Sequence, residues 1–182
     1  MRGLILGGAL ACALIATVAL SGCTSKEDPV QKDPAASSGL PAELMLSAAP
    51  AGAKPLGEVK QSAKQGDEIT FVARVGGTLN PFIDGRATMV VIDPSLDSCA
   101  DMGDDDHCST PWDYCCEPRD SLTANSATVQ IVGADGKPLP LGLKGQSGIE
   151  ELVTITVVGT VAEKNEEGLM IVNASGVHVK KG

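Results

Sequence analysis

Four cysteines, five aspartates and a histidine lie within one twenty-residue stretch, 99–118, which reads CADMGDDDHCSTPWDYCCEP. The same stretch holds the chain's only tryptophan and its only tyrosine. Thiols, imidazoles and carboxylates bind metal ions, while pairs of thiols also form disulfides or carry out redox exchange. The stretch therefore predicts one of three features: a metal site, a redox centre, or a loop stapled by disulfides.

Two kinds of metal site fit the residue types of this stretch. A transition-metal site would take three cysteines and a histidine, namely Cys99, His107, Cys108 and either Cys115 or Cys116. The C-x2-4-C pairs that bring thiolates together in structural zinc sites are missing, however. A calcium site would use the aspartates, but the EF-hand spacing fails because a loop starting at Asp104 has Cys108 in its fifth position. We therefore expect no bound cofactor, with calcium or a transition metal as the alternative.

The N-terminus has the pattern of an export signal. A basic residue at position 2 is followed by an apolar run without charges, 3–20, which leads into the tetrapeptide LSGC ending at Cys23. This tetrapeptide resembles the lipobox of bacterial lipoproteins, in which the cysteine is acylated and becomes the new N-terminus. The resemblance implies that 1–22 is a signal peptide, that Cys12 leaves with it, and that Cys23 carries a lipid such as palmitate.

A lipid on Cys23 would tether the mature protein to a membrane. Buried acyl chains contribute about 0.8 kcal/mol per methylene, so more than one chain gives stable anchoring. We therefore expect a protein of the bacterial cell envelope that faces the periplasm or the cell surface. Thr24 stands where some bacteria read an aspartate as an inner-membrane retention signal, which slightly favours the outer membrane.

Export also affects how the four cysteines of the stretch are interpreted. Thiols tend to oxidise outside the cytoplasm, and an even number of cysteines is compatible with two disulfides. Adjacent Cys115 and Cys116 would close a strained ring if they bonded to each other, so each is expected to pair with Cys99 or Cys108. Each bridge would stabilise the loop by about 3 kcal/mol. The acidic surroundings disfavour thiolate, which argues against a redox role.

The rest of the mature chain predicts a linker and one all-β domain. Residues 23–56 are rich in proline, alanine and serine, which is typical of a lipid-anchored flexible linker. No window of helical length in 57–182 shows the apolar period of a helix. Instead, β-branched residues dominate five segments: 69–75, 87–92, 127–131, 152–161 and 169–179. The acidic, disulfide-stapled loop 93–125 lies between the second and third of these strands.

Five strands with bends at glycine resemble an OB-fold, which is a small closed barrel. The first strand ends at Gly76 and Gly77, and Gly159 interrupts the fourth, where glycine lets a barrel strand curve. The resemblance fails at 133–148, which is too rich in glycine and proline for the usual helix between strands three and four. We expect a five-stranded OB-like barrel, with a β-sandwich as the alternative.

Composition and motifs argue against several function classes. Without the signal peptide the chain has 13 basic and 23 acidic residues, a net charge of −10, whereas proteins bind nucleic acids through clustered lysine and arginine. The sequence has no serine-hydrolase elbow, no H-E-x-x-H and no phosphate-binding glycine loop. His178 alternates with inward valines and is predicted to be a surface residue. We therefore expect a non-enzyme that does not bind nucleic acid.

The leading expectation is a membrane-tethered, non-catalytic module that binds an envelope protein or a carbohydrate. The two aromatic residues of the loop either pack onto the barrel or project as a recognition surface, as aromatic side chains often do at interfaces. The expected binding surface is the barrel face or the stapled loop. The candidate residues of the loop are Trp112, Tyr114, Asp104, Asp105 and Asp106. The chain also resembles small bacterial lipoproteins that carry a TPWDYCCEP-like segment. The alternative is an envelope metal-binding protein that uses the loop rich in cysteine, aspartate and histidine.

Overall fold

The computed structural model describes residues 39–103 and 108–181 of the chain. The export signal with Cys23, the aspartates at 104–106 and His107 lie outside the described residues. The expectations for these residues therefore stay predictions. No helix in the two described ranges is long and apolar enough to cross a membrane.

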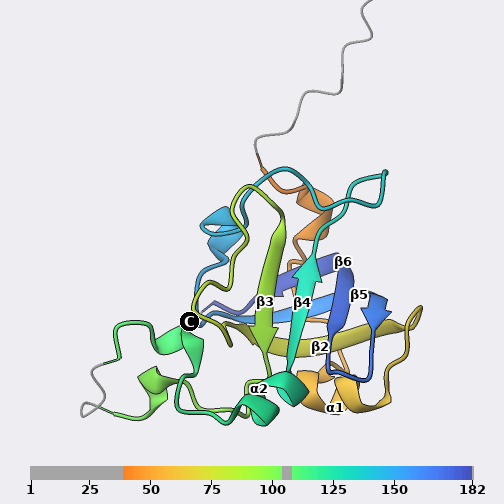
Figure 1. The fold of residues 1–182 in the computed structure, drawn as a ribbon. Coiled ribbons are helices and arrows are strands. Elements are labelled where there is room, and N and C mark those ends of the chain that lie inside the picture. The colour runs from red at the N-terminus through yellow and green to blue at the C-terminus, as the bar shows by residue number, and fades with distance from the viewer. Residues whose placement is uncertain (1–38, 104–107, 182) are drawn as a thin grey trace, which may run out of the picture. The chain divides into compact units, whose positions relative to one another are not determined.

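Five strands close into a mixed β-barrel (Figure 1). They are β2 (Glu68–Val75), β3 (Thr88–Ile92), β4 (Ser126–Gln130), β5 (Thr154–Lys164) and β6 (Met170–Val179). The order around the barrel is β2-β3-β4-β6-β5, and β5 pairs with β2 to close it. The pairing of β4 with β6 is parallel, and the other pairings in the ring are antiparallel. The short strand β1 (Lys54–Pro55) adds a parallel pairing to β2. This closed ring confirms the OB-like barrel and excludes the β-sandwich.

Alternation along the strands builds the barrel core. In β2, Phe71, Ala73 and Val75 are fully buried, while Arg74 on the other face is partly exposed. In β5, Ile155 is fully buried in the same way. Alternate residues of a strand point to opposite faces, so one face of each strand lines the interior. Burying each large apolar side chain contributes about 1.5–3 kcal/mol, which makes this interior the main source of stability.

Gly159, where the sequence predicted that a barrel strand curves, allows β5 and β6 to approach closely. Gly159 lies in β5 opposite Ala174, at the point where the pairing of the two strands changes register. A Cβ atom at Gly159 would lie 2.4 Å from the carbonyl oxygen of Asn173 and 3.1 Å from Ala174 Cα. Any side chain at this position would therefore force the two strands apart.

Two short α-helices, which the sequence did not predict, lie side by side at one end of the barrel (Figure 1). They are α1 (Leu56–Ser62) and α2 (Arg119–Asn125), each of seven residues. Leu56, Val59 and Ala63 are buried in the core at the i, i+3, i+7 spacing of a helix face. A helix this short holds too few apolar positions for its period to stand out in the sequence.

The segment 39–56, predicted to belong to the flexible linker, lies against the barrel. The one-turn 3-10 helix η1 (Ala42–Leu44) buries Leu44, which is 5% exposed. The backbone amide of Leu46 donates a hydrogen bond to the carbonyl oxygen of Val177 in β6 at 2.8 Å. The ordered domain therefore includes residues from Gly39 onward and begins before the predicted boundary at 57.

The long connection between β4 and β5 forms turns and the 3-10 helix η4 (Gln146–Gly148), with no α-helix. This is what its glycine and proline content predicted. At its first turn the amide of Gly136 donates to the carbonyl oxygen of Gly133 at 3.0 Å. A hairpin joins β5 and β6, where the Asn165 amide donates to the Leu169 carbonyl oxygen at 3.2 Å.

Candidate metal centre

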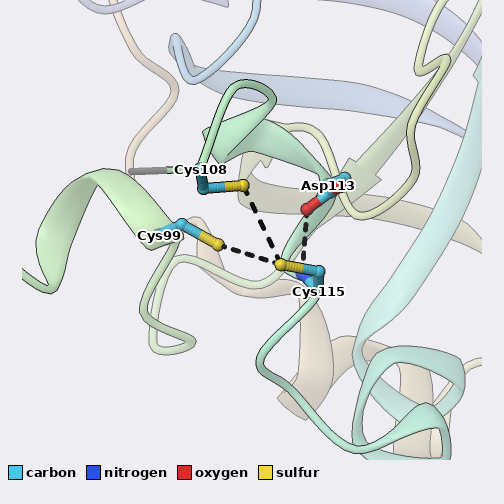
Figure 2. Close-up of side chains that lie close together, drawn as sticks. All are labelled: Cys99, Cys108, Asp113 and Cys115. Carbon is cyan, nitrogen blue, oxygen red and sulfur yellow. Dashed lines mark hydrogen bonds between the residues drawn. The ribbon is translucent and has the colours of Figure 1, made fainter. Parts of the chain in front are cut away.

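The insertion between β3 and β4 gathers three cysteines and an aspartate into one cluster. Two 3-10 turns, η2 (Cys99–Asp101) and η3 (Pro111–Asp113), supply or flank all of them. The four ligand atoms, three sulfurs and one carboxylate oxygen, lie within 4.8 Å of one another. The residues, hereafter the metal cluster, are Cys99, Cys108, Asp113 and Cys115. Figure 2 shows Cys99 and Cys108 pointing toward the Cys115 sulfur, with the Asp113 carboxylate beside it.

None of the sulfur distances in this cluster is that of a bond. The Sγ atom of Cys115 lies 3.5 Å from that of Cys99, 3.9 Å from that of Cys108 and 4.0 Å from that of Cys116. A disulfide brings two sulfurs to about 2.05 Å. The predicted pair of disulfides is therefore not formed in this structure. Cys115 instead has three sulfur neighbours, each of them well beyond bonding distance.

The spacing of the sulfurs matches a shared metal ion. Zinc binds thiolates at about 2.3 Å in a tetrahedron, which places the sulfurs of one site about 3.8 Å apart. The distances of 3.5 Å from Cys115 to Cys99 and 3.9 Å to Cys108 lie on either side of that value. The Asp113 carboxylate supplies a fourth donor of a type that also binds zinc. The cluster thus has the number and kinds of ligands that one zinc ion requires.

A hydrogen-bonded pair of polar residues fixes Cys99 against the barrel. Ser98 caps η2, and Oδ2 of Asp101 accepts from the Ser98 backbone amide at 2.9 Å and from its hydroxyl at 2.6 Å. Arg74 of β2 donates to the same Asp101 oxygen at 2.6 Å. These hydrogen bonds from Ser98 and Arg74 lower the pKa of Asp101 to about 2. The barrel therefore sets the position of the turn that carries Cys99.

Local hydrogen bonds orient the Asp113 carboxylate. Its Oδ2 accepts from the Thr110 hydroxyl at 2.9 Å, and its Oδ1 accepts from the Cys115 backbone amide at 2.9 Å. The Cys115 amide is within reach because Tyr114 adopts a left-handed conformation with φ of 57°. The turn therefore places the carboxylate of residue 113 beside the thiol of residue 115.

Trp112 and Tyr114 anchor the insertion to the barrel. Tyr114 is fully buried, and burial raises the pKa of its phenol to about 12. Of the two roles left open for Tyr114, packing or recognition, the burial of its side chain favours packing. Trp112 is half-buried, and its Nε1 donates to the Leu79 carbonyl oxygen at 3.0 Å. The Gly77 amide also donates to the Trp112 carbonyl oxygen at 2.8 Å, so the β2–β3 connection holds this turn.

The thiols of the cluster differ in their ease of deprotonation. Burial raises the pKa of Cys99, while a hydrogen bond from the Thr110 backbone lowers the pKa of Cys108. Hydrogen bonds with Cys99 and Cys108 raise the pKa of Cys115. Thiolates are the form that binds metals, and a bound ion would remove these protons.

A cleft of about 450 Å³ opens beside the metal cluster. Asp113 and Cys115 lie on its wall, together with residues of the β2–β3 connection and of α2. The two charged side chains that also line it are Glu117 and Arg119. The cluster is therefore buried on the side of Cys99 and accessible on the side of Cys115.

Comparison with known proteins finds no matching family model, no matching curated protein and no matching solved structure. The predicted ligands Cys99 and Cys108 do come together, and His107 lies outside the described residues. Asp113 was missed as a ligand, although its place two residues before Cys115 was a usable signal. His178, predicted on the surface, is half-buried, and its Nδ1 has no hydrogen-bond partner among the described residues.

Replacing Asp101 by asparagine is expected to change the acid stability of the domain. The pKa of Asp101 is lowered to about 2, so its contribution to folding is complete above about pH 4 and disappears as the pH falls through 2. The side chain is 39% exposed, which limits the effect to less than about 1 kcal/mol. Urea unfolding at pH 5 and pH 2.5 should show a smaller loss on acidification in Asp101→Asn than in the wild type. Equal losses would show that Asp101 does not contribute to the acid stability of the domain.

Proposed function

We propose that this chain is a lipid-anchored protein of the bacterial cell envelope whose OB-like domain binds one zinc ion or a similar thiophilic metal ion. The metal would be held by Cys99, Cys108, Asp113 and Cys115. The observation that carries the proposal is that the four ligand atoms of these residues lie within 4.8 Å of one another.

The chemistry of the donors favours a transition metal over calcium. Thiolates are soft ligands that select zinc, copper(I) and iron–sulfur clusters, whereas calcium takes six to eight oxygen ligands. The metal cluster offers three sulfurs and one oxygen. A carboxylate in a set of four donors suits zinc, which accepts sulfur, nitrogen and oxygen in one tetrahedron.

Metal binding takes precedence here over recognition of a protein or carbohydrate. The recognition hypothesis assumed that two disulfides use all four thiols and staple the loop that would form the binding surface. The sulfurs instead lie near one another without bonding, at 3.5 Å and 3.9 Å from that of Cys115, and the Tyr114 side chain is buried. The proposal retains a non-catalytic binding function and anchoring through Cys23.

The barrel around the metal cluster supports the proposed ligands. The strand residue Arg74 binds the turn that carries Cys99, and Tyr114, which is fully buried, lies between Asp113 and Cys115 in the chain. Ligands that are held before the ion arrives lose less conformational freedom on binding, so a rigid support strengthens a metal site. The barrel would act as the scaffold and the β3–β4 insertion as the binding element.

Cobalt(II) titration of the full-length protein under anaerobic conditions tests the proposal. The wild type should take up one equivalent and develop sulfur-to-cobalt charge-transfer absorption together with the visible bands of tetrahedral cobalt. Asp113→Asn should keep the charge-transfer absorption, shift the visible bands and weaken binding about tenfold, in the range of losses seen when metal-site surroundings change.

The control for this experiment is Asp120→Asn, which removes an exposed carboxylate in α2 that is not part of the metal cluster. It should give the wild-type spectrum and affinity. Absence of sulfur-to-cobalt absorption in the reduced wild type would refute the proposed function. Identical behaviour of the two aspartate variants would remove Asp113 from the ligand set.

A further inference from the structure

The arrangement around Cys116 points to a site that passes its metal ion on, and we infer that this protein transfers zinc to an acceptor. Cys116 would act as the exchange ligand that draws the ion from the buried side of the cluster to the exposed side. This inference rests on the proposed function, because it requires that the metal cluster bind zinc.

Burial divides the sulfurs into an inner and an outer group. Cys99 is 3% exposed, and its turn is tied to the barrel through Asp101 and Arg74. Cys115 and Cys116 are both exposed at the surface. Structural zinc sites are closed, with four fixed protein ligands. An arrangement with one buried sulfur, the half-buried sulfur of Cys108 and two adjacent exposed sulfurs is instead suited to exchange.

Cys116 lies at the right distance to bind the same ion. Its Sγ is 4.0 Å from that of Cys115, close to the separation of about 3.8 Å between two thiolates on one zinc. A strained ring disfavours a disulfide between adjacent cysteines, whereas joint binding of one ion does not require a sulfur–sulfur bond. The Cys115–Cys116 pair can therefore hold zinc at the surface of the insertion.

The ligand that Cys116 would replace is Asp113. Both of its carboxylate oxygens already accept hydrogen bonds, from the Thr110 hydroxyl and from the Cys115 amide. These hydrogen bonds hold the carboxylate in the turn, and it is the one hard donor among otherwise soft thiolates. Asp113 is thus the ligand of the cluster that zinc should release most readily.

The cleft beside the cluster gives an acceptor access to the ion. Cys115 and Asp113 lie on its wall, and its volume of about 450 Å³ admits a side chain of a partner or a small chelating molecule. An incoming ligand can therefore approach the outer face of the ion while Cys99 holds its inner face.

The exchange balances without any change in oxidation state. The Cys116 thiol gives its proton to solvent and forms a zinc–sulfur bond as the bond between zinc and Asp113 breaks. A thiolate of the acceptor then forms a zinc–sulfur bond as the bond to Cys99 breaks, and Cys99 takes up a proton from solvent. Repetition of this step at the other thiolates moves the zinc ion to the acceptor.

The test compares zinc transfer from the full-length wild type and from Cys116→Ser, each loaded with one equivalent of zinc without oxygen. The probe acceptor is the chromophoric chelator 4-(2-pyridylazo)resorcinol, whose absorbance reports the zinc that it receives in a stopped-flow instrument. Zinc affinity is measured separately by competition. We expect Cys116→Ser to bind zinc within about threefold of the wild type but to transfer it about tenfold more slowly.

Cys108→Ser is the matched control, because it makes the same chemical change at a residue of the metal cluster. It should bind zinc more weakly and release it faster. If Cys116→Ser behaves like Cys108→Ser, Cys116 is a resident ligand and the transfer role is refuted. Zinc transfer from Cys116→Ser at the wild-type rate would also refute the transfer role of Cys116. A reduced wild type that takes up no zinc at all would instead refute the proposed function itself.

Discussion

Replacing Cys99 by serine is expected to lower the affinity for zinc by at least about a hundredfold. Structural zinc sites bind with about 10–16 kcal/mol, so each of four ligands accounts for roughly 3 kcal/mol, and every 1.4 kcal/mol is a factor of ten. Cys99 is the buried member of the metal cluster, and its turn is held by Asp101 and Arg74. Competition with a zinc chelator in the reduced full-length protein measures the change.

A buried substitution also needs a check on folding. The near-ultraviolet circular dichroism of half-buried Trp112 reports whether the insertion keeps its place on the barrel. Cys116→Ser serves as the comparison, since it removes a thiol outside the ligand set and should leave the affinity nearly unchanged. If a folded Cys99→Ser protein bound zinc as tightly as the wild type, Cys99 would not be a ligand.

Replacing Lys60 by methionine is expected to destabilise the domain by about 3 kcal/mol. Each hydrogen bond to a charged group contributes about 1.5–3 kcal/mol to stability, and removing a buried charge offsets part of the loss. Lys60 of α1 is 6% exposed. Its Nζ donates at 2.6 Å to the carbonyl oxygens of Thr123, Ser126 and Gly168. Methionine fills the same space but leaves these three carbonyls without their donor. Urea unfolding at pH 7 measures the loss.

The same residue predicts a pH effect of defined sign. Burial, and then the nearby Lys164 ammonium, lower the pKa of Lys60 to about 8. An unfolded lysine titrates near pH 10.4, so between these values the unfolded chain binds more protons, and Lys60 makes the stability rise with pH. The difference in stability between wild type and Lys60→Met should therefore grow from pH 8 to pH 10.

The exposed lysine of the same segment is the control for this prediction. Lys64→Met makes the same chemical change four residues along, where the side chain is exposed to solvent. Its effect should stay within about 0.5 kcal/mol of zero, as for most surface substitutions. If Lys60→Met were no more destabilising than Lys64→Met, the contacts of Lys60 would not hold α1, α2 and the β5–β6 hairpin together.

The barrel strands could be predicted because their residues obey simple local rules. The β-branched residues of 69–75 indicated a strand, and the structure forms β2 there, with Phe71, Ala73 and Val75 buried on one face. Gly159 indicated a bend in β5 because only glycine allows the close approach seen there. These signals lie within a few residues of one another, so the sequence carries them without any tertiary context.

The short helices and the ordered segment before them depend on contacts that are distant in the sequence. Lys60 of α1 can be buried because its Nζ donates hydrogen bonds to three carbonyl oxygens from two other regions of the chain. Likewise, Leu46 joins the fold through Val177, which lies at the other end of the chain. Neither contact leaves a pattern in the local sequence.

The cysteine cluster also combines residue types that the sequence shows with an arrangement in space that it does not. The residue types predicted a metal site or disulfides, and the expected export to an oxidising compartment favoured disulfides. What decides between them is whether the sulfurs meet in two pairs or at one point, and this depends on Tyr114. Its left-handed conformation, with φ of 57°, turns Cys115 back toward Cys99 and Cys108. A single backbone conformation of this kind is hard to predict for a tyrosine, since left-handed residues are usually glycine or asparagine.

The most direct test of the metal centre is the native intact mass of the full-length protein, exported and then purified without oxygen or chelators. The proposed zinc site predicts a mass equal to that of the chain, with its lipid, plus one zinc ion in place of the thiol protons. A metal-free protein that is lighter than the reduced chain by four hydrogen atoms would show two disulfides among the four cysteines and would contradict the proposed function.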